Sequence, residues 1–382
     1  MMYGENNKWD VTEPEVTLNE EAHEIPKGGE KNGGIEWSIS GHLHADDGKQ
    51  YWIDVSLLSY PGLDLLAGSV GPSDITMFNL RTEEHLGKVV QSRLTPYKIG
   101  KFPNSQPLVF RHYPLHSRKI TRLEDRVVVE LGVSTFVCKD DKSWHYTMDD
   151  KETGVKVDLI HHGVGFPMWY NNQPKNKATN EELRQYTLNS FGGGYFWPGV
   201  VEGTITVGGK EIKVKGTGGR QRYYARNYSQ DEVGGWHDWH WFHFDEMHGC
   251  INEMKISNYK CMSLYMHDDA SYFPNGKLDI EHHDWALHTL LKALIPTRYK
   301  VTVENDAGVL VLTGDIIGTR VWASIKVPDS PFTMFDWGNV QGTFTYKDGR
   351  KKTLTNGSAG GLIRQWRPYP SPYLPDESEL KI

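Results

Sequence analysis

The chain has 382 residues and a formal net charge of -7, with 42 basic and 49 acidic residues interspersed along its length. This length exceeds what a single core of ordinary size holds, so two domains are expected. The mixed charges give no basic face, which argues against nucleic acid as a partner, and the abundance of Tyr, Trp, Phe and Gly favours an all-β fold.

The first residues, Met1 to Glu24, are polar and acidic and lack the apolar segment of a signal peptide, and we interpret residues 1–33 as an N-terminal extension. No later stretch approaches the roughly 20 apolar residues of a membrane span. The three cysteines are too few and too scattered for a disulfide framework, which favours a reducing compartment. We therefore expect a soluble, cytoplasmic protein.

Two hairpin patterns occur twice, in the same order. The opening pattern runs from Gly33 to Val55, with its turn at 46–48, and returns from Gly234 to Ile256, where His248-Gly249 is the expected turn. The closing pattern is Glu202 to Gly219 and returns as Gln341 to Gly361. One Gly-Thr hairpin can recur by chance, but two ordered matches favour a duplication. The expected domains are 34–228 and 233–370, followed by a C-terminal tail at 371–382.

Few helices are expected between these hairpins. A short one is predicted over Asn180 to Asn189, and a better one begins at Asp284, carries apolar residues from Trp285 to Leu294 and ends at Pro296. Residues 299–304 and 309–313 alternate as a plain hairpin. Antiparallel strands with few helices, present twice, predict two tandem lipocalin-like β-barrels, and a small barrel can enclose one ligand.

The run from Gly234 to Asp245 holds five aromatic residues, three histidines and two carboxylates. If it is a strand, one face carries Asp238, His240 and the two phenylalanines, and the other carries Trp239, Trp241 and His243. Each face combines apolar surface with proton-transfer groups. Such a mixture suits a pocket for a greasy substrate that reacts without a cofactor.

The chain resembles the two-domain lipocalin-like family of carotenoid and kievitone hydratases, hydroxyneurosporene-synthase-like proteins and fungal Diels-Alderases. The segments that carry the resemblance are Glu36-Trp37 with Gly41-His42-Leu43, Phe196-Trp197-Pro198 with 201–206, Trp239-His240-Trp241, Pro296 to Tyr299 with 308–312, and Val340 to Thr343. The resemblance implies paired calycin-like barrels, an apolar pocket, no cofactor, and acid–base or pericyclic chemistry on an isoprenoid- or polyene-like molecule.

In the hydratase branch of this family, paired positions on two strands supply the acid–base groups. The matching positions here are Asp238 and His240 on the first strand and Tyr265 and His267 on the strand that begins at Lys260. The alternative is that each is a hydrogen-bonded structural residue. Trp239 and Trp241 are expected to shape the substrate site.

The segment 218–226 departs from the family, because relatives carry an acidic or His-Asp segment where this chain has arginines and tyrosines. Arg222, Tyr223 and Tyr224 are therefore candidate substrate contacts, and a substrate with a carbonyl, enolate or carboxylate becomes plausible. Tyr223 and Tyr224 point in opposite directions on a strand, so one of them serves the pocket.

Glu36 and His42 are further substrate-binding candidates, although a solvated outer face also explains their alternation. Trp197 is a further substrate-binding candidate that would shape the site, and the alternative for it is a wall of the core beside the turn at Pro198. A metal site at His237, His240 and His243 is not favoured, because His240 points away from the other two on a strand. The doublets 161–162 and 282–283 are expected at strand ends in solvent.

Three functions stay open at this point. The leading one is a hydratase- or cyclase-like enzyme in which Asp238 and His240 exchange protons. A pericyclase would only template a polyene, and a carrier would bind a hydrophobic ligand without chemistry. A carrier is expected to leave Asp238 and His240 facing solvent, because burial of such groups costs roughly a few kcal/mol.

Overall fold

The structure is a computed structural model. It describes residues 16, 18–22, 34–46, 48–60, 63–72, 81–82, 86–87, 94–95, 108–114, 117–152, 154–169, 193–225, 237–254, 259–268, 272–273, 276–284, 286–288, 293–324 and 327–364. Two compact units are present. The N-terminal unit comprises residues 11–72 and 106–233, and the C-terminal unit comprises 1–10, 73–105 and 234–382.

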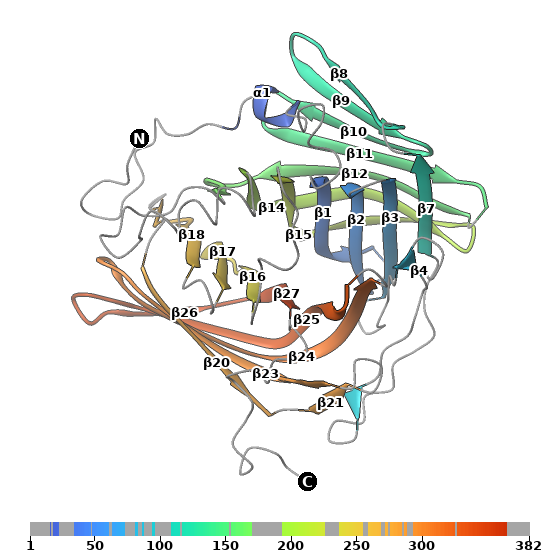
Figure 1. The fold of residues 1–382 in the computed structure, drawn as a ribbon. Coiled ribbons are helices and arrows are strands. Elements are labelled where there is room, and N and C mark those ends of the chain that lie inside the picture. Colours follow the sequence, from blue (N-terminus) through green and yellow to red (C-terminus); the bar gives the residue numbers. More distant parts are fainter. Residues whose placement is uncertain are drawn as a thin grey trace. The chain divides into compact units, whose positions relative to one another are not determined.

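The described part of the N-terminal unit contains one short helix and a large antiparallel sheet (Figure 1). Its elements are α1 (Leu18–Glu21), β1 (Gly34–Ala45), β2 (Gln50–Tyr60), β3 (Leu63–Pro72), β7 (Leu108–Pro114), β8 (Lys119–Arg122), β9 (Arg126–Leu131), β10 (Ser134–Lys139), β11 (Ser143–Asp150), β12 (Val155–Gly163), β13 (Met168–Trp169), β14 (Gly193–Val207) and β15 (Lys210–Ala225).

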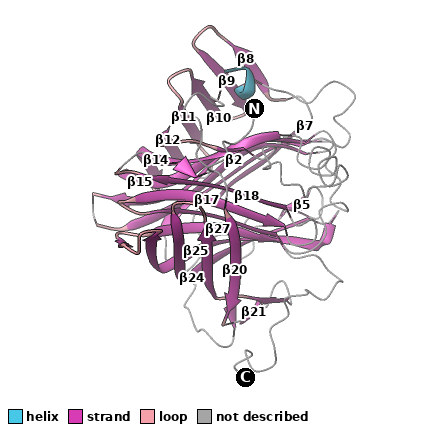
Figure 2. Cartoon of the chain, turned by 90° about the vertical axis from the view of Figure 1, so that its left-hand side faces the viewer, coloured by secondary structure: helices cyan, strands magenta, loops and turns pink. Residues whose placement is uncertain are grey.

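The C-terminal unit is built from strands throughout its described part, as the colouring of Figure 2 shows. They are β4 (Arg81–Thr82), β5 (Leu86–Gly87), β6 (Leu94–Thr95), β16 (His237–His243), β17 (Met247–Met254), β18 (Tyr259–Met266), β19 (Tyr272–Phe273), β20 (Lys277–His283), β21 (Ala286–His288), β22 (Ala293–Ile295), β23 (Arg298–Glu304), β24 (Gly308–Ser324), β25 (Val327–Tyr346), β26 (Lys351–Leu354) and β27 (Ser358–Arg364).

The strand orders of the two large sheets correspond to each other. The N-terminal order is β7-β3-β2-β1-β15-β14-β12-β11-β10-β9-β8, and the C-terminal order is β19-β18-β17-β16-β27-β25-β24-β23-β20. In both, the opening hairpin lies beside the last strand of the unit, β15 in one and β27 in the other. The all-β prediction with two curled antiparallel sheets is confirmed, and the shared order agrees with the repeat seen in the sequence.

The C-terminal sheet curls so that its two ends meet. Lys260 on β18, near one end of the order, donates a hydrogen bond of 2.7 Å from Nζ to the backbone oxygen of Leu278 on β20, the strand at the other end. The curl places side chains from β16, β20 and β23 around one interior. Residues that are distant in the sequence therefore come together inside this sheet.

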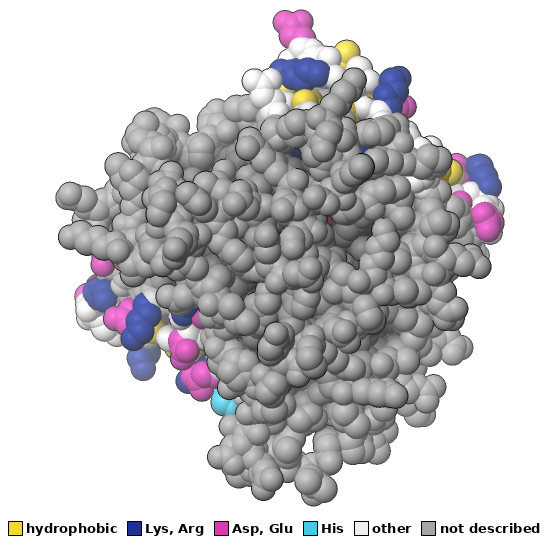
Figure 3. All heavy atoms as spheres, in the orientation of Figure 1, with side chains coloured by type: hydrophobic (Ala, Val, Ile, Leu, Met, Phe, Trp, Pro, Cys, Tyr) yellow, Lys and Arg dark blue, Asp and Glu magenta, His cyan; other side chains and the backbone are white. Residues whose placement is uncertain are grey.

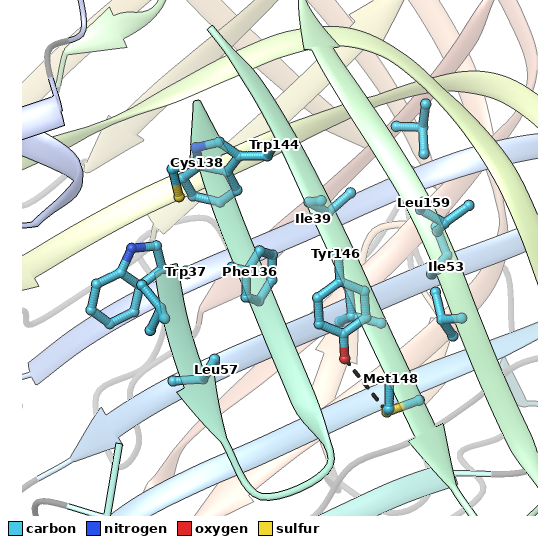
Figure 4. Close-up of a cluster of buried hydrophobic side chains, with 14 of the residues drawn as sticks. Trp37, Ile39, Ile53, Leu57, Phe136, Cys138, Trp144, Tyr146, Met148 and Leu159 are labelled. Atoms are coloured by element: carbon cyan, nitrogen blue, oxygen red, sulfur yellow. Dashed lines mark hydrogen bonds between the residues drawn. The ribbon is translucent and has the colours of Figure 1, made fainter. Parts of the chain in front are cut away.

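Each unit has its own apolar core. In the N-terminal unit Phe136, Trp144 and Tyr146 are 0 % exposed, and their rings pack together on one side of β10 and β11 (Figure 4). Trp37, on β1, belongs to the same core. The C-terminal core includes Phe242 and other residues from β16 to β27. On the described surface visible in Figure 3, basic and acidic side chains lie beside one another.

Two expectations about local structure are wrong. The hairpin of β16 and β17 turns at Phe244 to Met247, so His248 and Gly249 lie within β17 rather than in the turn. Residues 286–288 and 293–295 form two strands rather than parts of a helix, and Leu287 pairs with both Leu294 and Thr95. Pairing with β6 overrides the helical spacing of the leucines. The helix expected over 180–189 lies outside the described residues.

Asp284 does not begin a helix as predicted. Its φ is 51°, in the left-handed region, and its backbone oxygen accepts a hydrogen bond from the backbone N–H of Thr297 at 3.2 Å. Asp284 thus shapes a turn before β21. The pairing of β6 with β21 also joins residues 94–95 to the C-terminal unit. The sequence repeat had placed these residues in the first domain.

Replacement of Gly203 by alanine is expected to destabilise the N-terminal unit by more than about 3 kcal/mol, because its Cβ would lie 2.0 Å from the backbone oxygen of Asp158 and its φ is 147°. The matched control is Gly208→Ala, whose φ is 59° and whose Cβ meets nothing within 4 Å. That control is expected to cost about 1 kcal/mol. Denaturant unfolding of both variants measures the difference, and equal costs would contradict the close approach.

Candidate acid–base site in the C-terminal unit

Strand register decides which side chains share a face of the β16–β17–β18 sheet region. His240 pairs with Ile251, which pairs with Met262, and both apolar residues belong to the C-terminal core. Because directly opposed residues lie on the same face, His240 faces this core. Asp238, two residues earlier, faces it as well. The predicted assignment of Asp238, His240 and Phe242 to one face is confirmed.

Asp238 lies between two histidines inside the sheet. Its Oδ2 is 2.9 Å from Nε2 of His282 on β20, and its Oδ1 is 3.4 Å from Nε2 of His240. The Asp238 side chain is 0 % exposed, that of His240 1 % and that of His282 4 %. The structure therefore brings Asp238 and His240 together and adds His282, which the sequence had placed in solvent.

Aromatic rings enclose this group. The His240 ring meets Tyr299 at 4.9 Å and Trp337 at 5.3 Å between centroids, both edge-on, while Tyr299 and Trp337 stack on each other. The His282 ring also meets Tyr299 edge-on. The indole N–H of Trp337 is buried and donates no hydrogen bond within the described part of the chain. It is a donor that a polar atom of a bound molecule can use.

The surroundings set the protonation states. Burial alone would raise the pKa of Asp238, but the charge of His282 and the hydrogen bonds from His240 and His282 outweigh it and hold the pKa below its usual range. Burial lowers the pKa of His240, and Asp238 offsets this only in part. Burial also raises the pKa of the Tyr299 hydroxyl. At neutral pH the cluster thus combines an ionised carboxylate, a neutral imidazole and a protonated phenol.

A second ion pair lies on the same face of the sheet. Glu253 is the cross-strand partner of both Asp238 and Lys260, and its Oε1 is 2.7 Å from the Lys260 Nζ. The Glu253 side chain is 2 % exposed. Its negative charge acts on His240 in the direction that raises the pKa of the imidazole. The face that carries His240 is therefore ionic at one end and apolar at the other.

Tyr265 and His267 lie on the opposite face of these strands. His243 pairs with His248, and His248 pairs with Tyr265. His248 Nδ1 is 2.7 Å from His267 Nε2, and His267 Nδ1 is 2.6 Å from the backbone oxygen of Asp245. The structure thus separates the four predicted catalytic residues into two pairs, and the two polar faces do not meet.

Trp239 and Trp241 share that opposite face with His243. They are 7 % and 1 % exposed, yet neither belongs to the apolar core of its unit. Their indoles therefore lie on the face that carries His243 and His248 rather than on the face of His240. The expected division of the run into two faces is confirmed, but it places the two tryptophans away from Asp238.

Acid is expected to destabilise the chain partly through His243. Burial lowers its pKa to about 4, against about 6.5 for an unfolded histidine. Between these values the unfolded state binds a proton that the folded state does not, so stability is full above pH 6.5 and falls as the pH decreases toward 4. His243→Gln is expected to reduce the slope of unfolding free energy against pH by up to about one proton. Denaturant titrations across this pH range measure it, and an unchanged slope would contradict the shift.

The substrate-binding candidates of the N-terminal unit are placed as follows. Glu36 is partly buried and accepts hydrogen bonds from Ser56 and from Gln221. His42 is 9 % exposed, so the solvated outer face considered for it is wrong. Trp197 is 3 % exposed within the core, which agrees with the core alternative for it.

Arg222 is 0 % exposed and lies over the ring of Trp37 at 4.0 Å. Its Nη1 donates to the backbone oxygens of Glu36 and Tyr223. Tyr223 is partly buried, and its cross-strand partner is Glu36, so it lies on the face opposite Arg222. The side chain of Tyr224 lies outside the described residues. Arg222 therefore packs on an aromatic ring of the core and binds backbone oxygens of its own unit.

The sequence missed His282, Tyr299, Trp337 and Glu253. Their side chains come from strands β20, β23 and β25, which the curl of the sheet brings near β16, and from β17, the hairpin partner of β16. For Tyr299 the sequence did hold a signal of burial, because the alternation of residues 299–304 puts it on the same face as Val301 and Val303 of the core. A buried tyrosine in such a row calls for a polar partner.

His240 and His243 lie on opposite faces, as the strand geometry requires. Within the described ranges, no group of three or more His, Cys, Asp or Glu side chains is arranged to hold a metal ion. None of the helices in the described part of the chain has the length and apolar character needed to cross a membrane.

Comparison with known proteins adds information about the fold. No family model and no curated protein match the sequence. Among solved structures, a Nitrosomonas europaea protein provisionally named AttH is similar at 12% identity, over 93% of this chain and 98% of that one, with a TM-score of 0.53. Kievitone hydratase from Nectria haematococca shares 13% identity over 96% of this chain and 97% of its own, with a TM-score of 0.46. At such identities the similarity shows the fold alone.

Proposed function

We propose that the chain is an enzyme of the lyase or isomerase type, hydratase- or cyclase-like, that moves protons on an apolar isoprenoid- or polyene-like molecule without a cofactor. The observation that supports it is the Asp238–His240 pair, buried at 0 % and 1 % exposure with side chains 3.4 Å apart. A carrier has no need to bury these groups. An enzyme that transfers protons in a dry site does.

The protonation states suggest the roles. Neutral His240 is the base, and ionised Asp238 orients its ring and stabilises the imidazolium that forms. Tyr299, rather than Tyr265, is the proton donor on this face, because its ring meets that of His240 at 4.9 Å. The π faces of Tyr299 and Trp337 stabilise cationic character that develops on the substrate.

In a hydration, the acid gives its proton to one alkene carbon, and water bonds to the other carbon as the base removes a water proton. Elimination reverses both steps. In a cyclisation a second double bond of the substrate attacks the cation instead of water, and the base then removes a carbon-bound proton from the new cation. The buried N–H of Trp337 is available for an oxygen of the substrate or for the attacking water. A substrate with a hydroxyl or carbonyl next to its alkene fits this arrangement.

Incubation with a panel of isoprenoid and polyene alkenes in heavy water tests the proposal. A hydration or a proton-initiated cyclisation is expected to give a product with deuterium on carbon, and an elimination is expected to give a product that has lost the mass of water. A product without solvent deuterium, formed equally well by His240→Ala, would identify a pericyclase instead. Retention of a panel member without conversion would identify a carrier.

A further inference from the structure

A second buried cluster of ionisable side chains lies in the N-terminal unit, around Arg220, which is 0 % exposed. Its guanidinium carbon lies 5.0 Å from the ring centroid of Trp144, 5.5 Å from that of Tyr195 and 4.7 Å from that of Trp197. Nη1 donates to the backbone oxygen of Lys142 at 2.5 Å. A cation enclosed in this way requires a negative partner close by.

That partner is Glu21, the last residue of α1, whose side chain is 3 % exposed. Its Oε1 accepts hydrogen bonds from the Tyr195 hydroxyl at 2.5 Å and from the Trp144 indole at 2.9 Å. Trp37 donates to the backbone oxygen of Glu21 at 3.3 Å. The short helix thus carries a carboxylate into an aromatic core, part of which is drawn in Figure 4.

The pairing of Glu21 with Arg220 is incomplete. Glu21 Oε1 lies 3.8 Å from Arg220 Nη2, beyond hydrogen-bond distance. Arg220 Nε and Nη2, and Glu21 Oε2, are buried and make no hydrogen bond within the described part of the chain. Nε and Nη2 form the edge of a guanidinium that matches the two oxygens of a carboxylate. Glu21 therefore leaves unused the edge that is best suited to an acid.

His161 adds a further polar group to the cluster. It is 0 % exposed and pairs directly across the sheet with Trp144, so both side chains lie on the same face as the core. Its ring nitrogens have no side-chain hydrogen-bond partner among the described residues, and backbone groups of His161 and Trp197 are polar neighbours of the ring. Burial, and next the positive charge of Arg220, lower its pKa, which keeps the imidazole neutral. A neutral imidazole can donate to, or accept from, a bound polar molecule.

We propose that this cluster is a binding site for a small carboxylic acid with an aromatic or extended apolar body, whose carboxylate replaces Glu21 as the counter-charge of Arg220. The carboxylate of the ligand binds Nε and Nη2 of Arg220, and its body lies against the rings of Trp144 and Trp197. A neutral ligand is disfavoured, because displacement of Glu21 would leave Arg220 without a counter-charge.

The element that carries Glu21 is suited to displacement. α1 has four residues, a single turn that has little stability of its own and depends on its contacts with the core. Leu18 is 9 % exposed against that core. The site lies within the N-terminal unit and does not involve Asp238 or His240, so it stands or fails independently of the proposed acid–base function.

Calorimetric titration with trans-cinnamate tests the site, with cinnamamide as the uncharged probe. Glu21→Gln keeps the shape of the side chain but removes the competing charge, so it is expected to bind cinnamate at least about tenfold more tightly than the wild type. Arg220→Met in the same background is expected to abolish binding. Glu202→Gln, which removes a surface carboxylate 2.8 Å from Lys215, is the matched control and is expected to bind as the wild type does.

Two results would overturn the site: affinity for cinnamate that does not rise in Glu21→Gln, or equal affinity for cinnamamide. If Glu21→Gln is too unstable to titrate, its thermal midpoint is measured with increasing acetate. The site predicts that acetate raises the midpoint while chloride at equal ionic strength does not. Equal effects of the two salts would likewise count against a carboxylate site.

Discussion

Turnover of an alkene substrate is expected to fall by a factor of about one hundred or more when His240 is replaced by alanine. The imidazole is the neutral base of the Asp238–His240 pair, and its removal leaves the carboxylate without the group through which it acts. The effect is expected in kcat more than in KM, because the base contributes in the transition state. Steady-state kinetics on the alkene that is converted in heavy water measures it.

The control for this variant is a second His–Asp pair in the other unit. His145 Nε2 lies 2.7 Å from Asp158 Oδ1 at the surface, with side chains 33% and 63% exposed. His145→Ala is expected to leave kcat unchanged. If His240→Ala keeps near-normal turnover while product still forms, the site templates its substrate and does not transfer protons through His240.

Asp238→Ala is expected to destabilise the C-terminal unit by about 3–5 kcal/mol. The substitution leaves the buried imidazoles of His240 and His282 without the carboxylate that pairs with them, in a region where neither side chain exceeds 4 % exposure. Asp238→Asn retains the volume and separates the loss of charge from the loss of packing. Denaturant unfolding followed by tryptophan fluorescence measures both variants.

Asp158→Ala is the matched control for stability, since its carboxylate also pairs with a histidine but is 63% exposed. A surface pair of this kind contributes between zero and about 1 kcal/mol. Equal destabilisation by Asp238→Ala and Asp158→Ala would show that the buried charge pair is not an energetic feature of the fold.

Alternation within one strand could be predicted from the sequence because a strand has a period of two. It placed Asp238 and His240 on one face and Trp239 and Trp241 on the other, and the register with β17 agrees. The hairpin of residues 299–313 and the position of Trp197 in the core followed from equally local patterns. Such features depend on neighbours in the sequence.

Features that depend on the curl of a sheet could not be predicted. His282 reaches Asp238 across 44 positions of sequence, and Glu21 reaches Tyr195 across 174. The leucines near residue 287 have the spacing of a helix. Their strand partner at 94–95 is too distant in the sequence for the pairing to be recognised. The pair His282-His283 was expected in solvent because the sequence does not show that the buried carboxylate of Asp238 lies next to His282.

The protonation state of His240 tests the central claim most directly, and it needs no substrate. Nitrogen chemical shifts of the imidazole, assigned by comparison with His240→Ala, are followed by NMR from pH 8 to pH 5. His240 is expected to stay neutral below the ordinary histidine pKa of about 6.5, because burial disfavours its charge despite Asp238. An imidazole that takes up its proton at or above pH 6.5 would contradict a buried neutral base and the acid–base function built on it.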